Sequence, residues 1–311
     1  MASVLDFISY PDVPTVYGPI SELLFVFSYW LSPANILPIK CMVFLSTVGL
    51  MILVSSKVSR QNLLIFCWCP LILFQFSLNA HIDSIAVLLL FISIQTAKNI
   101  KWWLAPFFLS LAIMTKIFAL LAVPFILVSR RQYFLLSVIL CCVYFPLLLS
   151  GKHEFLGLYV MVNDWVFNSI IYSLWINYFD NLWIKWIIAL AFIIFYIHLV
   201  SAKNPIDDLY NKSHSLFLVY AVFILSLSAI NPWYLIWFLA FSLFTNYRWP
   251  WVLATSVWCY LYTGLNTNDH SIDLYEIPLE ILIVEYGLVL IFSMVMASYS
   301  KTSRKTRSLP N

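Results

Sequence analysis

A histidine and an aspartate, His81 and Asp83, stand two residues apart between two apolar runs of membrane length. The aspartate comes at the predicted start of a helix, where the helix dipole favours a carboxylate and free N–H groups can bind an anion. Capping is the commoner use of such an aspartate, but a histidine beside it at a membrane surface is harder to explain as packing. We therefore keep two interpretations, a helix cap and a working polar site at the edge of the hydrocarbon phase.

A single lysine, Lys116, interrupts a long apolar stretch that begins at Trp103 and continues beyond Pro124. Either one long span carries a lysine in mid-membrane, or two short helices form a hairpin with Lys116 at its outer turn. The hairpin is preferred, because it places Lys101 and Arg130 together on the inner side. At such a turn the ammonium group would bind a lipid phosphate, or would simply extend to the headgroups by snorkelling.

Two further segments combine aromatic side chains with polar ones. The long loop between two apolar runs carries Trp165 and Asn168, whose indole and carboxamide groups stack on sugar rings and hydrogen-bond to them. A tryptophan at a membrane interface is also commonly a plain anchor. Later in the chain, Pro232 suits the first turn of a helix, which leaves the adjacent pair Trp233 and Tyr234 unexplained.

The composition shows what kind of protein must position these residues. With 63% hydrophobic and only 10% charged residues, the chain has too little polar surface for a soluble globule. Its mean hydropathy of +0.91 and 18% aromatic residues, with few glycines, favour membrane helices with aromatic belts over a porin-like barrel. The formal charge of +3 forms no basic stripe, so no nucleic-acid partner is expected, and no histidine or cysteine spacing predicts a metal site.

The predicted fold class is therefore all-α, a polytopic transmembrane helical bundle. A bilayer core takes about 20 helical residues, or fewer where helices are short or broken. On this basis we expect eleven spans, at residues 39–56, 63–78, 83–97, 103–115, 117–129, 132–149, 183–201, 215–231, 233–247, 250–263 and 280–299. The short apolar segment Ser21–Leu31 follows a proline-rich polar stretch and is predicted to be an interfacial helix.

The predicted organisation is one integral membrane domain over residues 1–300, followed by a basic cytoplasmic tail at 301–311. Residues 1–38 would be an outer segment with the interfacial helix, and residues 39–300 the bundle. Because Lys and Arg are retained in the cytoplasm, we expect an outer N-terminus, which leaves only positions 40, 116, 152 and 185 of the 17 basic residues outside. The polar segments described above then all face the extracytoplasmic side.

Taken in order, these segments resemble the multi-spanning glycosyltransferases of the GT-C fold, in particular the bacterial polyprenyl-phosphate-sugar-dependent mannosyltransferases. The Tyr10–Phe25 stretch is similar to the family pattern hPxxPTxYxPhxxxhF, and Asn79–Asp83 is similar to its Asn-Gly-His-x-Asp element. The further likenesses are Leu111–Lys116, Trp165–Ser169 and Pro232–Trp237. Each is weak alone, whereas five in the same order make the resemblance fairly specific.

The resemblance implies an inverting hexosyltransferase of a bacterial inner or plasma membrane. Such an enzyme takes a hexose, expected to be mannose, from a polyprenyl-phosphate donor and transfers it to a lipid- or glycan-linked acceptor on the extracytoplasmic face. A carboxylate removes the acceptor proton, and cationic and polar groups hold the departing phosphate. Lys116 and His81 would face that phosphate, and the donor is a substrate, so no cofactor is assigned. The substrate-binding residues implied are Tyr17, His81, Lys116, Trp165, Asn168, Trp233 and Tyr234.

One part of the family pattern has no counterpart in the chain. Relatives carry a first span and then an acidic loop that supplies the usual catalytic base, whereas Asp6 here matches no such motif. A truncated start is the preferred explanation, and the others are a protein that no longer catalyses or a base recruited from Asp12 or Asp83. A lipid or solute transporter is a further alternative, although it predicts internal repeats that the sequence does not show.

Overall fold

The computed structural model describes residues 15–97, 101–149, 156–163, 165–179, 183–202, 209–259 and 277–307. Within these residues the regular elements are helices, and the β geometry consists of one isolated parallel bridge between Phe167 and Ala229. The predicted all-α class is therefore confirmed for the described part of the chain.

Most of the helices follow one another along the chain after short connections. In chain order they are α2 (Pro19–Leu31), α3 (Leu37–Ser55), α4 (Arg60–Cys67), α5 (Pro70–Ile72), the π-helix η1 (Leu73–Leu78), α6 (Asp83–Thr96), α7 (Leu104–Thr115), the 3-10 helix η2 (Ile117–Ala122), α8 (Val123–Ile126), α9 (Arg130–Leu149), α10 (Leu156–Asn163), α11 (Ile170–Phe179), α12 (Trp183–Ala202), α13 (Leu209–Leu225), the 3-10 helix η3 (Pro232–Leu235), α14 (Ile236–Ser242), α15 (Trp249–Ser256) and α16 (Leu279–Arg307).

Four helices are long and apolar enough to cross a membrane, namely α3, α9, α12 and the Leu279–Met296 part of α16. A fifth crossing results if α4 and Pro70–Leu78, which meet at a bend of 47°, are counted as one broken span. The chain thus has the helices of a membrane protein, whereas the predicted count of eleven spans is not confirmed.

The difference in span count has a physical reason. The predicted spans at 83–97 and 103–115 form helices of 14 and 12 residues, each about 20 Å long, and a hydrocarbon core is about 30 Å thick. In α14 all seven residues are buried inside the protein. Hydropathy alone does not separate these helices from spans, because a protein interior and lipid select the same apolar side chains.

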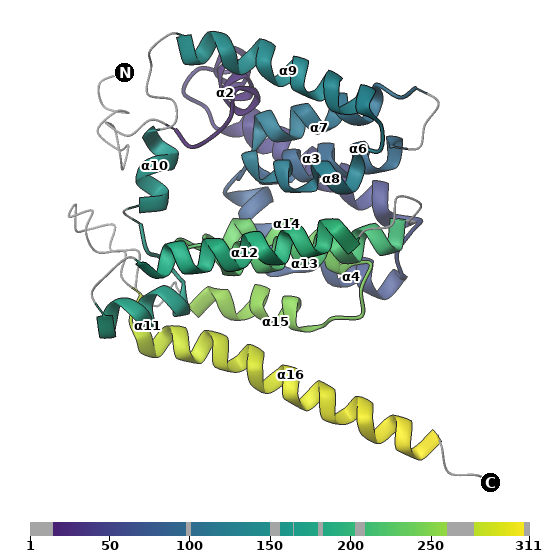
Figure 1. Cartoon of the computed structure of the whole chain (residues 1–311), viewed down its shortest axis with the longest axis vertical. Helices are drawn as coiled ribbons and strands as arrows, with labels where there is room; N and C mark the ends of the chain where they lie inside the picture. The colour runs from purple at the N-terminus through teal and green to yellow at the C-terminus, as the bar shows by residue number, and fades with distance from the viewer. Residues whose placement is uncertain are drawn as a thin grey trace.

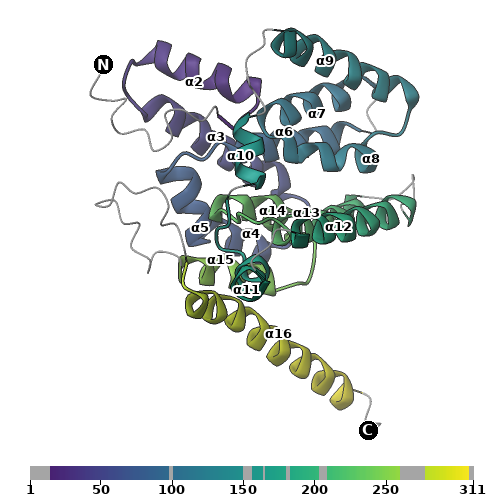
Figure 2. The ribbon, with the colours of Figure 1, turned by 60° about the vertical axis from the view of Figure 1, so that its left-hand side comes forward.

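The helices are arranged in layers that both ribbon views show (Figures 1 and 2). The group α2, α3, α6, α7 and α8 lies at the top with α9 across it, the group α12, α13 and α14 lies below, and α15 and α16 form the lowest layer (Figure 1). In Figure 1, α10 and α11 lie at one end of these layers, and α16 runs from α11 towards the opposite end. The described residues 165–169, between α10 and α11, thereby lie at the end opposite to the last turns of α16.

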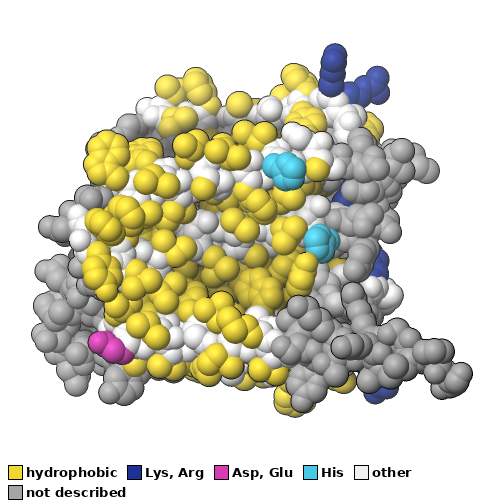
Figure 3. Space-filling model, turned by 60° about the horizontal axis from the view of Figure 1, so that its bottom comes forward, with side chains coloured by type: hydrophobic (Ala, Val, Ile, Leu, Met, Phe, Trp, Pro, Cys, Tyr) yellow, Lys and Arg dark blue, Asp and Glu magenta, His cyan; other side chains and the backbone are white. Residues whose placement is uncertain are grey.

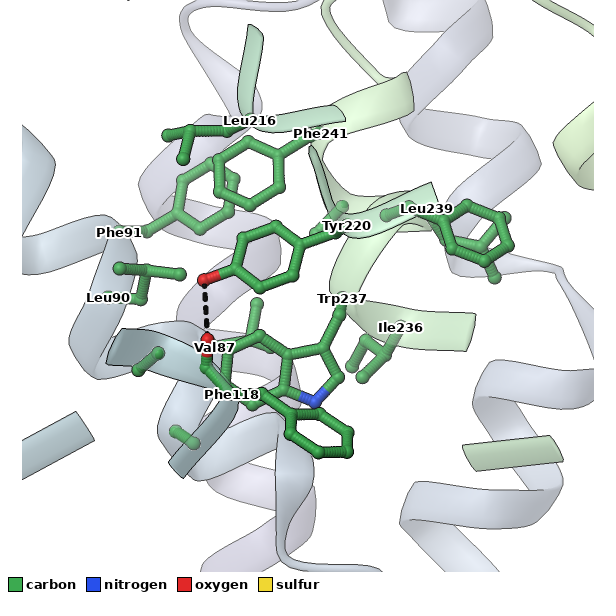
Figure 4. Packing of buried hydrophobic residues seen from close by; sticks show 14 of the residues in the cluster. Val87, Leu90, Phe91, Phe118, Leu216, Tyr220, Ile236, Trp237, Leu239 and Phe241 are labelled. Atoms are coloured by element: carbon green, nitrogen blue, oxygen red, sulfur yellow. Dashed lines mark hydrogen bonds between the residues drawn. The ribbon is translucent and has the colours of Figure 1, made fainter. Parts of the chain in front are cut away.

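Aromatic packing between α6, α13 and α14 forms the core (Figure 4). Phe91 stacks on Phe241 with ring centres 4.7 Å apart, and Tyr220 stacks on the same ring at 5.6 Å. The Tyr220 hydroxyl donates to the Phe118 carbonyl oxygen at 3.3 Å, which ties α13 to η2. Because lipid tails are as apolar as these side chains, close packing and such hydrogen bonds hold helices together in a membrane.

The outer surface carries the apolar residues that a lipid environment requires. Trp186 and Ile194 on α12 are 73% and 61% exposed, and Met294 on α16 is 67% exposed. Figure 3 shows one such face, on which Lys and Arg gather at one edge. On α2, Trp30 points outward while Ser21 packs inward, as a helix in contact with lipid would be arranged.

The basic tail predicted at 301–311 is in part a continuation of the last helix. α16 extends to Arg307 over 29 residues, so the first residues of that tail are helical. At 1.5 Å per residue the helix is about 44 Å long, which exceeds a hydrocarbon core of about 30 Å.

Candidate functional site

Lys116 is buried, with 3% of its surface exposed, at the break between α7 and η2. Its Nζ lies 4.7 Å from the centre of the Tyr17 ring, 5.0 Å from that of Tyr234 and 5.2 Å from that of Phe118. A desolvated cation over an aromatic face is stabilised by about 2 kcal/mol or more. The predicted break at Lys116 is confirmed, and the snorkelling interpretation is wrong, because aromatic rings enclose the ammonium group instead of leaving it exposed.

The start of α2 delivers the Tyr17 ring to this position. The Gly18 N–H donates to the Thr115 carbonyl oxygen at 3.4 Å, and the Ser21 hydroxyl donates to the same oxygen at 2.7 Å. Thr115 is the last residue of α7, and the final carbonyl groups of a helix have no partner within it. These two contacts therefore cap α7 and fix Tyr17 next to Lys116.

Gly18→Ala is expected to open this junction. A Cβ atom at Gly18 would overlap the carbonyl oxygen of Met114, which belongs to a helix backbone and cannot move aside. We expect destabilisation of about 1–3 kcal/mol, the usual cost of overpacking, measured as a lower thermal midpoint in lipid nanodiscs. The matched control is Gly287→Ala on α16, where an added Cβ meets no atom within 4 Å. Equal midpoints for the two variants would contradict the close contact.

Asp83 is fully buried at the first turn of α6. One carboxylate oxygen accepts a hydrogen bond from Trp237 Nε1 on α14 at 2.9 Å, and the other oxygen has no hydrogen-bond partner among the described residues. The carboxylate therefore joins two helices, so a helix cap alone does not account for it. Lys116 is close enough to act electrostatically on Asp83, and a buried carboxylate needs such a compensating charge.

The His81 ring stacks on Trp233, with ring centres 3.7 Å apart and an angle of 11° between the planes. The His81 backbone N–H donates to the Gln75 carbonyl oxygen in the π-helix at 3.0 Å. Burial, with a smaller effect of Lys116, lowers the pKa of His81 to about 4. The imidazole is therefore neutral near pH 7 and offers one donor and one acceptor nitrogen.

The backbone that carries His81 is strained at the residue before it. Ala80 has a φ of 60°, in the left-handed region that glycine adopts without cost.

Ala80→Gly is expected to stabilise the fold by about 1 kcal/mol, because the unfavourable left-handed conformation of an alanine is relieved. The measurement is the thermal midpoint in nanodiscs. Ala86→Gly, in the buried interior of α6, is the matched control and should lower the midpoint through lost helix propensity. A lower midpoint for Ala80→Gly would show that the strain is absent.

The loop segment with Trp165 and Asn168 lies along the segment that leads into η3. The Phe167 N–H donates to the Ser228 carbonyl oxygen at 2.9 Å, and the Ile230 N–H donates to the Phe167 carbonyl oxygen at 2.7 Å. Asn168 is buried, whereas Trp165 is half-buried. The pairing holds this loop beside residues 228–230. These residues come just before η3, which carries the aromatic pair Trp233 and Tyr234.

The structure thus brings most of the predicted site residues together. The residues of the cluster around the ammonium group, named here the lysine cluster, are Tyr17, His81, Asp83, Lys116, Trp233 and Tyr234. Trp165 and Asn168 lie on the adjoining loop segment rather than in direct contact with the ammonium group. Asp12 lies outside the described residues.

Sequence reasoning missed three contributors to this region. Phe118 supplies a ring to Lys116, Trp237 donates to Asp83, and Glu285 on α16 accepts a hydrogen bond from Asn168 Nδ2 at 3.2 Å. A carboxylate inside an otherwise apolar helix is a signal for Glu285, because such a charge is costly in a membrane. Phe118 gave no signal, since its neighbours in sequence are equally apolar, whereas Trp237 ends the Pro232–Trp237 segment of the resemblance but was assigned no role.

The lysine cluster has the chemistry of an anion site. Lys116 makes no hydrogen bond through its ammonium group to any described residue, while a neutral imidazole and a buried indole N–H of Trp233 without a partner lie in the same cluster. Donors fixed in a water-poor environment stabilise negative charge strongly. Among the described residues no group of three or more His, Cys, Asp or Glu side chains could hold a metal ion. No family model, no curated protein and no solved structure matches the chain.

Proposed function

We propose that the chain is a membrane hexosyltransferase of a bacterial inner or plasma membrane. It takes a hexose, with mannose as the expected sugar, from a polyprenyl-phosphate donor and passes it to a lipid- or glycan-linked acceptor on the extracytoplasmic face. The observation that carries this proposal is the buried Lys116 ammonium, held by three aromatic rings without a hydrogen-bonding anion among the described residues. A phosphate at the membrane surface is the anion that such a position suits.

The proposed reaction uses the lysine cluster at the leaving group. The acceptor hydroxyl oxygen forms a bond to the anomeric carbon, and the bond from that carbon to the phosphate oxygen breaks with its electron pair. Lys116 stabilises the charge that develops on the departing phosphate, and neutral His81 donates a hydrogen bond to it. A carboxylate takes the proton of the acceptor hydroxyl. The candidates for that base are Asp83, through its oxygen without a partner, and Asp12.

The distribution of charge supports an outer site. On the face in Figure 3, Lys and Arg gather at one edge, as the cytoplasmic end of membrane helices would require. The described residues 165–169, between α10 and α11, lie at the end of the helix layers opposite to the last turns of α16 (Figure 1). A cytoplasmic C-terminus would then put these residues outside.

The direct test is a transfer assay with the purified full chain in lipid nanodiscs. Polyprenyl-phosphate mannose labelled in the sugar is supplied with a mixture of membrane glycolipids, and both labelled product and released polyprenyl phosphate are measured. We expect labelled glycolipid and polyprenyl phosphate in equal amounts. If polyprenyl phosphate neither binds nor is released, the proposal is wrong.

A second candidate is a protein of the same kind that binds the lipid phosphate without catalysis. The observation in its favour is that Asp83 is fully buried and accepts a hydrogen bond from Trp237. A carboxylate that only compensates the charge of Lys116 can be buried in this way, whereas a catalytic base must face the acceptor hydroxyl. This candidate predicts saturable binding of polyprenyl phosphate with no labelled product. Lipid or solute movement across liposomes containing the chain, without sugar transfer, would instead favour a transporter.

A further inference from the structure

Three buried oxygen atoms that have no hydrogen-bond partner among the described residues belong to two segments that meet at one end of the fold. They are Asn168 Oδ1, Ser169 Oγ and Glu285 Oε2, and each belongs to a side chain that is at most 1% exposed. Leaving a buried acceptor unpaired costs about 1–3 kcal/mol, and more for a charged group. Three such atoms in one place therefore indicate groups that a ligand would satisfy.

The surrounding contacts hold these oxygens in a fixed arrangement. Asn168 Nδ2 donates to Glu285 Oε1 at 3.2 Å, and the neighbouring Tyr286 hydroxyl donates to the Asn168 carbonyl oxygen at 2.9 Å. Asn168 has a φ of 52°, an unfavourable conformation that these two contacts from α16 maintain. Glu285 and Tyr286 of α16 thus bind the side chain and the backbone of Asn168, respectively. The three oxygens named above are not used in these hydrogen bonds.

The chemistry of the leftover atoms points to hydroxyl groups. The amide and carboxylate oxygens accept hydrogen bonds, and the Ser169 hydroxyl both donates and accepts. A sugar hydroxyl likewise donates one hydrogen bond and accepts others. A metal ion fits less well, because Asn168 Nδ2 donates to the Glu285 carboxyl group, and the described residues contain no group of three or more His, Cys, Asp or Glu side chains that could hold one.

The apolar side chains around these oxygens also suit a sugar. Ile277 and Leu282 form a small buried cluster, and the rings of Phe167 and Tyr286 pack against it. Flat aromatic faces next to a few polar atoms can take the C–H faces and the hydroxyl groups of a sugar ring together.

We propose that Asn168, Ser169 and Glu285 form a binding site for the hydroxyl groups of a neutral sugar, separate from the phosphate-binding lysine cluster. The identification of that sugar as the acceptor rests on the proposed function. In this site Glu285 is a binding residue, and its Oε2 accepts a hydrogen bond from a sugar hydroxyl.

The first variant is Ser169→Ala, which removes a hydroxyl that has no partner among the described residues. A structural serine would lose stability on this change, whereas loss of an unsatisfied buried hydroxyl should leave the thermal midpoint unchanged or raise it. The probe is octyl α-mannoside, titrated into the full chain in nanodiscs with 1-octanol as the control for the alkyl chain. We expect roughly fivefold weaker binding of the mannoside, the effect of one hydrogen bond.

The matched control is Ser213→Ala on α13. Ser213 is also fully buried with a hydroxyl that has no partner among the described residues, but it belongs to a different part of the fold. This change should affect the midpoint in the same direction as Ser169→Ala and leave mannoside binding unchanged.

The second variant is Glu285→Gln, which keeps an oxygen for Asn168 and replaces the free acceptor by an NH2 donor. We expect roughly tenfold weaker binding of octyl α-mannoside, because the oxygen that accepts from the sugar hydroxyl is replaced by a donor. Glu285→Gln should not change the binding of polyprenyl phosphate. Lys116→Met should weaken the binding of polyprenyl phosphate and leave the binding of octyl α-mannoside unchanged.

The outcomes separate this inference from the proposed function. If octyl α-mannoside binds no better than 1-octanol, or binds equally to wild type and both variants, the sugar site is refuted, while binding of polyprenyl phosphate through Lys116 would still stand. If calcium or magnesium binds to wild type and not to Glu285→Gln, the site is a cation site and the inference is also overturned. If the mannoside site behaves as expected and polyprenyl phosphate does not bind, the proposed function fails instead.

Discussion

Lys116→Met is expected to lower sugar transfer from a polyprenyl-phosphate donor at least tenfold, and towards the hundredfold that one lost charge-stabilising contact can cost. The ammonium group is the one cation in the lysine cluster, and it is already held by the rings of Tyr17, Phe118 and Tyr234. No reorganisation is then needed when charge develops on the phosphate, which is why its removal should act mainly on the rate. Methionine fills a similar apolar volume among the rings without the charge.

The measurement is the initial rate of product formation in nanodiscs, together with the affinity for polyprenyl phosphate. Lys40→Met on α3 is the control, because this lysine is also predicted to lie on the outer side, whereas the cation–ring contacts in the cluster are made by Lys116. We expect Lys40→Met to behave as wild type. Transfer by Lys116→Met at the wild-type rate would remove the phosphate role of Lys116.

Asp83→Leu is expected to destabilise the fold by about 3–5 kcal/mol, the usual cost of leaving a buried charge without its compensating partner. The change removes the acceptor of the Trp237 indole and the negative charge that acts on Lys116. Both losses occur where the residues are at most 3% exposed, so water cannot replace them.

The double variant Asp83→Leu/Lys116→Met tests whether charge is the cause. Removing both charges leaves no buried charge without its partner, so we expect the double variant to regain most of the stability that Asp83→Leu loses, apart from the lost hydrogen bond to Trp237. The free energy of unfolding of the four proteins is measured by denaturant titration in mixed micelles. If the two losses simply add, the charges are not coupled and Asp83 acts through its hydrogen bond alone.

The polar residues of the lysine cluster are predictable from sequence because placing an ionisable side chain at membrane depth costs free energy. Asp83, Lys116 and His81 stand in a chain with few charges, and ionisable groups at membrane depth are rarely kept without a use. The same argument applied to Glu285 would have found the second group, but its helix was treated as an ordinary span. Phe118 and Trp237 could not be found in this way, since in an apolar chain an aromatic residue that contacts a site looks the same as one that packs in the core.

The sequence by itself determined the helical character, the membrane environment and the segments that carry polar chemistry, because composition and solvation cost are properties of the residues themselves. The tertiary structure decided how many helices are long enough to cross the bilayer, since α6, α7 and α14 are buried by protein rather than shown to face lipid. It also decided that Lys116 is enclosed by the rings of Tyr17 and Tyr234, which are distant in the chain, together with that of the neighbouring Phe118, instead of exposed at a turn. Both depend on contacts between residues far apart in the chain, which hydropathy and spacing do not record.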